Sequence, residues 1–125
     1  MAGKIVADTL EHSTAGSVDT QYVVNGSAKA WSAFDGSGTV AIDGSNNVST
    51  LTDNGTGDYT IILQNAFGLA PQVLGIVPTS TGVYRFEVVA KDIDRVTVNF
   101  FNAAGAAVDA DFDICLAGTD MDYTM

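Results

Sequence analysis

Three aspartates near the end of the chain are the first candidates for chemistry. Asp109, Asp111 and Asp113 alternate with apolar residues, so on a strand their carboxylates share one face about 7 Å apart. A single Ca²⁺ ion holds its ligands at about 2.3–2.6 Å, and a row spaced this widely does not surround one ion. We interpret the row as a solvated strand face or, alternatively, as a docking surface for the Lys and Arg side chains of a partner.

A second acidic cluster lies at residues 53–58, which read DNGTGD. Carboxylates stand at both ends, but the EF-hand ligand spacing and its distant glutamate are missing. Asn-Gly favours positive φ angles, and the added Thr56 and Gly57 suggest a slightly longer loop with a bulge. The cluster therefore predicts a hairpin between strands at 48–51 and 59–63, and we expect no metal site.

Catalytic groups are few and isolated. His12 is the single histidine, and Glu11 and Glu87 are the only glutamates, so no glutamate pair suited to glycoside hydrolysis is evident. No G-x-S-x-G elbow or phosphate-binding glycine motif is present. Cys115 lies between two apolar residues, as expected of a small buried hydrophobe. We expect no enzyme and no cofactor, although a small carbohydrate-active enzyme remains a third function class.

Composition and charge limit the classes of partner that the protein can bind. The 125 residues are 46% hydrophobic and carry a formal net charge of −10, from 15 acidic and 5 basic residues. The length suits one domain, and the charge opposes binding to nucleic acid. The single cysteine forms no internal disulfide, and no apolar run approaches the roughly 20 residues that cross a bilayer. The first residues, MAGKIVADTL, lack the pattern of a signal peptide.

The elements that would position these residues are short strands separated by turns. Residues 83–89 should place Tyr84, Phe86 and Val88 toward a core, with Arg85 and Glu87 outward. The remaining predicted strands lie at 39–42, 72–77, 95–101 and 107–116, and a turn is predicted at 43–47. In the strand at 95–101, Val96, Val98 and Phe100 share one face. Such spacing predicts an all-β fold, an antiparallel β-sandwich or jelly-roll-like barrel spanning residues 29–125.

Residues 1–28 differ from this pattern. Ile5-Val6 and Tyr22–Val24 are apolar islands. Ile5, Val6 and Leu10 could form one short strand and Tyr22–Val24 another, but residues 11–20 are mostly small and polar. The segment lacks the means to build its own core, so it is either a mobile tail or an arm ordered against a partner. Because of the apolar islands, we favour an extended attachment or subunit-contact arm.

Two large apolar residues lie at the start of the predicted sandwich domain. Trp31 and Phe34 lie in a stretch compatible with either a helical turn or a strand. We expect both to be buried, in the core or at a subunit seam, since aromatic residues of a small β-protein mostly serve its core. If Trp31 is exposed instead, it becomes a candidate for a ligand site such as a glycan contact.

The first half of the chain resembles a known class of proteins. Residues 29–42 read KAWSAFDGSGTVAI, residues 47–60 read NVSTLTDNGTGDYT, and the chain begins MAGKIVADTLEHST. These segments resemble virion structural and tail-fibre proteins of tailed bacteriophages, over about residues 1–60. The resemblance supplies no catalytic residues.

The resemblance implies a function and a location. It implies a capsid decoration (cement) protein or a short head or tail fibre, made in the host cytoplasm and carried on the phage particle. The implied partners are copies of itself, as a homotrimer, and phage capsid or tail proteins. The alternative is a tail-fibre tip that binds a receptor or a host surface glycan.

Overall fold

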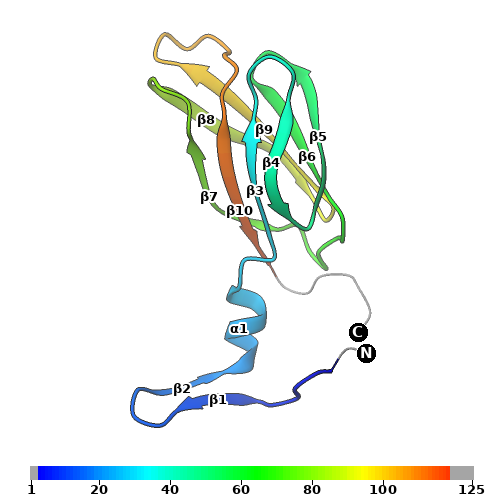
Figure 1. Cartoon of the computed structure of the whole chain (residues 1–125), viewed down its shortest axis with the longest axis vertical. Helices are drawn as coiled ribbons and strands as arrows, with labels where there is room; N and C mark the ends of the chain where they lie inside the picture. The colour runs from blue at the N-terminus through cyan, green and yellow to red at the C-terminus, as the bar shows by residue number, and fades with distance from the viewer. Residues whose placement is uncertain (1–2, 119–125) are drawn as a thin grey trace.

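Two four-stranded antiparallel sheets pack face to face in the computed structural model, which describes residues 3–118 (Figure 1). The strand order of the first sheet is β4-β3-β10-β7, with bounds Ala41–Asn46, Ala30–Asp35, Phe112–Ala117 and Gln72–Pro78. The strand order of the second is β5-β6-β9-β8, with bounds Val48–Gly55, Asp58–Leu63, Arg95–Asn102 and Tyr84–Asp92. The predicted all-β antiparallel sandwich is confirmed.

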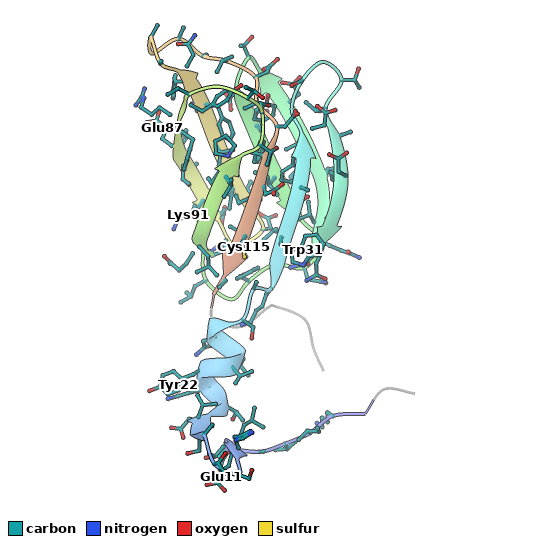
Figure 2. All side chains as sticks on the ribbon, turned by 60° about the vertical axis from the view of Figure 1, so that its left-hand side comes forward. Glu11, Tyr22, Trp31, Glu87, Lys91 and Cys115 are labelled. Atoms are coloured by element: carbon teal, nitrogen blue, oxygen red, sulfur yellow. The ribbon has the colours of Figure 1, made fainter. Side chains whose placement is uncertain are left out.

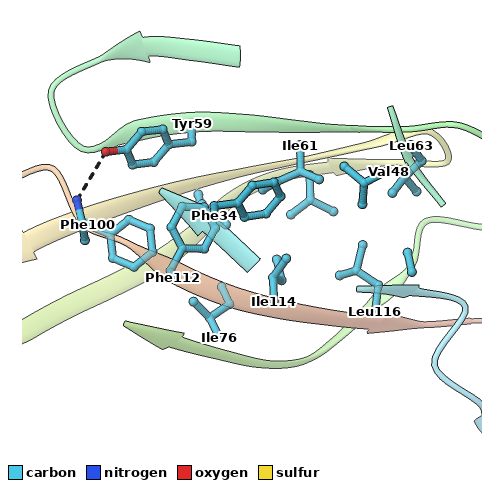
Figure 3. Close-up of a cluster of buried hydrophobic side chains, with 14 of the residues drawn as sticks. Phe34, Val48, Tyr59, Ile61, Leu63, Ile76, Phe100, Phe112, Ile114 and Leu116 are labelled. Carbon is cyan, nitrogen blue, oxygen red and sulfur yellow. Dashed lines mark hydrogen bonds between the residues drawn. The ribbon is translucent and has the colours of Figure 1, made fainter. Parts of the chain in front are cut away.

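The core is formed by alternate residues of the inner strands. Val96, Val98 and Phe100 of β9 are fully buried, as their alternation predicted. The Phe112 ring lies 4.9 Å from that of Phe34 and 4.8 Å from that of Phe100, between ring centroids (Figure 3). Burying one large apolar side chain contributes about 1.5–3 kcal/mol, so this aromatic cluster holds the two sheets together.

The β5–β6 hairpin and its bulge are also confirmed, but the turn is tighter than expected. The register shifts between Asp53 and Gly55, and only Thr56 and Gly57 form the turn. Gly57 has a φ of +67°, a value at which glycine is favoured. The Asn54-Gly55 pair belongs to strand β5, because the bulge absorbs the extra residue.

The predicted turn at 43–47 is wrong. Strand β4 continues to Asn46, and the chain reverses at Asn47, which adopts a φ of +60°. Asn47 stabilises this reversal through two hydrogen bonds to Asn65. Its Nδ2 group donates to the Asn65 carbonyl at 3.1 Å, and its Oδ1 accepts from the Asn65 backbone N–H at 2.7 Å. A side chain that bonds to backbone allows asparagine this conformation.

Strand β8 is less covered than its alternation predicted. Phe86 and Val88 are 40% and 37% exposed, and no residue of the strand is buried. The cause is its position, since β8 is an edge strand. The predicted outward pair is confirmed, with Arg85 Nη1 3.8 Å from Glu87 Oε2.

The predicted strand at 107–116 begins later. Strand β10 starts at Phe112, and residues 107–111 lie outside the sheets apart from one bridge between Ala107 and Phe101. The expected strand face that would carry all three aspartates therefore does not exist.

The described N-terminal segment, residues 3–28, forms a hairpin and a short helix. Strands β1 (Thr9–His12) and β2 (Gly16–Asp19) pair with each other, and α1 spans Thr20–Gly26. The strand expected at Tyr22–Val24 is wrong, because these residues lie in α1. No side chain from residue 3 to residue 28 is buried. The division of the chain at residue 28 stays a prediction.

Candidate functional site

Asp109 is exposed, and its carboxylate also makes hydrogen bonds within the fold. Its Oδ1 atom accepts a hydrogen bond from the Gly57 backbone N–H at 2.8 Å and lies 3.2 Å from the Tyr59 hydroxyl. Both contacts reach the β5–β6 hairpin from the segment before β10. Asp109 therefore joins two loops.

Asp111 makes a matching connection to the turn after β3. Its Oδ1 accepts hydrogen bonds from the Gly36 N–H and the Ser37 hydroxyl, both at 3.0 Å. Desolvation by burial opposes ionisation of this carboxyl. The hydrogen bond from Ser37 and the others outweigh it and hold the pKa of Asp111 below its ordinary value. Asp109 and Asp111 therefore do not form one strand face with Asp113, although Asp109 stays exposed. Docking of the three aspartates onto a partner stays a prediction.

Tyr59 completes this end of the sandwich. Its side chain is fully buried, and the hydroxyl donates to the Gly36 carbonyl at 2.7 Å. The hydroxyl also accepts from the Ala110 N–H at 3.3 Å, the dashed line in Figure 3. Burial raises the pKa of the phenol well above its ordinary value, and the nearby Asp109 charge acts in the same direction. A neutral phenol that both donates and accepts is a structural group here.

Trp31 is exposed in the single chain, so the expectation that the core would bury it is wrong, whereas burial at a subunit seam stays a prediction. Its relative exposure is 46%, whereas Phe34 is 1% exposed, as predicted. The two residues are three apart on β3, so they face opposite sides of the strand. Ala30 and Ser32 share the buried side with Phe34, which leaves the tryptophan ring on the outer face of the sheet.

The Trp31 ring borders a hollow on this outer face. The hollow has a volume of about 430 Å³. We call it the outer hollow. The residues that line it include Trp31, Ala33, Leu74, Gly75, Val77, Asp113 and Cys115. Figure 2 shows Trp31 and Cys115 on the same side of the sheet.

The register of the sheet explains the outer hollow. Cys115 pairs with Trp31 on one side and with Gly75 on the other, so a large ring stands near a residue with no side chain. A register shift between Cys115 and Leu116 leaves Leu74 without a partner on β10, and it is 58% exposed. The result is an apolar depression beside an aromatic ring.

Asp113 is the charged group of the outer hollow. Among residues 3–118 its carboxylate has no hydrogen-bond partner within the chain, unlike those of Asp109 and Asp111. An aromatic face, apolar walls and one carboxylate suit the binding of an apolar side chain or a sugar ring. Nothing in this arrangement pairs a nucleophile with a base.

The other predicted contact residues lie outside this hollow. Ile5, Val6 and Tyr22 are 91%, 84% and 63% exposed, in the N-terminal segment. Leu74, Val77 and Cys115 were not predicted as site residues. The alternation of residues 112–117 could have placed Cys115 beside Asp113, but the register shift that exposes Leu74 has no sequence signal.

The remaining candidates for chemistry have local roles. His12 Nδ1 accepts from the backbone N–H of Ala15 at 3.0 Å and so closes the β1–β2 turn. Within the described part of the chain, no three potential metal-ligating side chains come together. Over the same residues, no helix has the length and apolar character needed to cross a membrane.

Comparisons with known proteins give no relative. The chain matches no protein family, no curated protein and no solved structure.

Proposed function

We propose that this protein is a non-enzymatic structural protein of a tailed-bacteriophage particle. It acts as a capsid decoration protein or short fibre that assembles as a homotrimer, and it attaches through its N-terminal segment. It is made in the host cytoplasm and functions on the particle surface. The resemblance of residues 1–60 to virion proteins supports the class.

One observation carries the proposal of an assembly role. The N-terminal segment contains seven large apolar residues that are each at least 40% exposed: Ile5, Val6, Leu10, Val18, Tyr22, Val23 and Val24. Contiguous exposed apolar residues on a soluble protein mark an interaction surface, since their hydration is unfavourable. A segment of this kind gains its stability from a partner surface that covers it.

The test is incorporation into particles. Tagged protein supplied during growth of the parent phage should sediment with purified particles, and electron microscopy of the tag distinguishes head from tail. A variant with Tyr22→Asp and Val24→Asp should keep its circular dichroism spectrum in the strand region but be lost from particles. A matched control is Thr9→Asp with Ser17→Asp on the exposed hairpin. Particles without tagged wild-type protein would refute the proposal.

A second candidate function is a tail-fibre tip that binds a host surface glycan. The specific observation in its favour is the half-exposed Trp31 ring beside the unpartnered Asp113 carboxylate in the outer hollow. A ring face packs against the C–H face of a sugar, and a carboxylate accepts hydrogen bonds from hydroxyl groups. A glycan array that compares wild type with Trp31→Ala tests this function. If the protein binds glycans in the outer hollow, the variant should lose the binding signal.

A further inference from the structure

One side of the sandwich is open. β7 is one of the two edge strands of the first sheet and β8 is one of the two edge strands of the second, and β7 and β8 lie on the same side of the molecule (Figure 1). An edge strand presents unpaired backbone N–H and C=O groups, which are a template for another strand. This side is therefore able to accept an additional strand.

The side chains at the open side also lack cover. Phe86 pairs with Phe100 and Val88 pairs with Val98, and directly paired residues share one face of a sheet. Phe100 and Val98 are fully buried, yet Phe86 and Val88 are 40% and 37% exposed. The first sheet therefore covers the core-facing side chains of β8 only in part.

The chain contains a segment with the pattern of a missing strand. Residues 3–7, GKIVA, precede β1 and pair with no strand within the described residues. In an extended conformation Ile5 and Ala7 share one face and Lys4 and Val6 the other. Five extended residues span about 17 Å. The segment is therefore shorter than β7, which has seven residues, and fits along its edge.

Charge favours this segment as the contact between copies. A chain of net charge −10 repels its own copies. Residues 3–7 carry one lysine and no carboxylate, so they add no negative charge to the repulsion between copies. Residue 7 is held at the start of α1, where the Thr20 hydroxyl donates to the Ala7 carbonyl at 2.6 Å, and residues 3–6 extend from that point.

We propose that residues 3–7 of one copy add as a strand to the free edge of β7 in a second copy. Ile5 and Ala7 then cover Phe86 and Val88, and Val6 lies on the outer face, where Leu74 and Val77 are exposed. Each copy gives a strand and receives one, so the contact is head to tail, and in the homotrimer of the proposed function it closes into a ring. This inference rests on the self-assembly in the proposed function and names the surfaces that meet.

Disulfide trapping tests the pairing in the full-length chain. In a Cys115→Ala background, Ile5→Cys with Val88→Cys should give disulfide-linked multimers on a non-reducing gel, ending in a closed ring. Ile5→Cys with Glu87→Cys is the matched control, since Glu87 lies on the opposite face of β8, and it should stay unlinked. A disulfide within the monomer, or equal linking in the control, would overturn the proposal.

Proline substitution gives an independent readout. Only alternate N–H groups of an added strand point toward β7, and proline removes one N–H group. Proline is placed in turn at positions 4, 5, 6 and 7. Each variant is compared with alanine at the same position, or with the wild type at Ala7. Proline should raise the dissociation constant of the oligomer at least tenfold at every second position. Uniform loss, or no loss, would overturn the added strand.

The two tests also separate this inference from the proposed function. Particles that retain the protein although Ile5→Cys with Val88→Cys gives no cross-link would overturn the pairing and leave the function standing. Cross-linked rings that never join particles would support the pairing and refute the function.

Discussion

The hydroxyl group of Tyr59 lies 2.7 Å from the carbonyl oxygen of Gly36, and this hydrogen bond joins the two sheets at one end of the sandwich. Tyr59 belongs to β6 of one sheet, and Gly36 follows β3 of the other. A side chain added at Gly36 would place its Cβ 2.0 Å from the Ala110 carbonyl oxygen. The tyrosine and the glycine therefore depend on each other.

Tyr59→Phe should destabilise the protein by about 1–3 kcal/mol. The change leaves the Gly36 carbonyl and the Ala110 N–H without their partner in a buried setting. Urea unfolding measures the effect. Tyr84→Phe is the matched control, because the Tyr84 hydroxyl makes a single long bond of 3.3 Å at an exposed position. Equal losses in both variants would contradict the role of Tyr59.

The same tyrosine predicts a loss of stability in alkali. The pKa of Tyr59 is raised in the folded state, and an unfolded tyrosine titrates near 10. Stability from this group is complete below pH of about 10 and declines as pH rises further, because the unfolded chain then releases the proton more readily. Tyr59→Phe lacks this decline, so the stability gap between variant and wild type should narrow above pH 10.

Gly57→Ala should disrupt folding, whereas Gly38→Ala should cost only about 1–2 kcal/mol. The two glycines have similar φ angles, +67° and +62°, so both substitutions carry the same backbone strain. They differ in space: a Cβ at Gly57 meets the Val108 carbonyl oxygen at 2.6 Å, and one at Gly38 meets nothing within 4 Å. Because the backbone strain is the same, a difference between the melting temperatures of the two variants measures the effect of the close contact at Gly57. Similar melting temperatures would contradict it.

Asp111→Ala should remove about 1 kcal/mol of stability at neutral pH, and Asp113→Ala should change it little. The folded-state pKa of Asp111 is lowered, so its contribution is present above its unfolded pKa of about 4 and is lost as pH falls through the folded value. The difference between wild type and Asp111→Ala should shrink in acid. Denaturant titrations from pH 7 to 2 measure it, and a difference independent of pH would contradict the ionised role.

Trp31→Ala should destabilise the subunit far less than Phe34→Ala. Truncating a fully buried phenylalanine costs about 3–5 kcal/mol, whereas the Trp31 ring is already half in water. Trp31 is the only tryptophan, so its fluorescence reports on the outer hollow alone. In the free subunit, acrylamide should quench it readily. Equal losses of stability in the two variants would contradict the outward position.

Alternation predicted which residues share a face but not whether that face is covered. In β9 the predicted core face is also buried, because this inner strand lies under the opposite sheet, where Phe100 packs on Phe112. In β8 the face of Phe86 and Val88 was predicted correctly, yet the burial was not. Coverage depends on where the opposite sheet ends, and that is a property of the whole fold.

The errors at the candidate site have local physical causes. Trp31 was expected in the core or at a subunit seam, but β3 places small residues, Ala30 and Ser32, on the core face beside the aromatic cluster. Asp109 and Asp111 were read as strand residues, although long-range bonds from Gly57 and Gly36 decide their position. Such contacts join residues more than fifty positions apart, and no local pattern encodes them.

The antiparallel pairing of β3 with β10 gives the domain a mechanical direction. Ala30 lies opposite Leu116, and the Lys29 ammonium group donates to the Gly118 carbonyl at 2.6 Å just outside the ladder. Tension between residues 29 and 118 would break that contact first and then peel the ladder open one bond after another. Tension from residue 29 toward the Tyr59 end would load the same bonds together, in shear. A subunit anchored by its N-terminal segment and pulled at the opposite end is strained in its stronger direction.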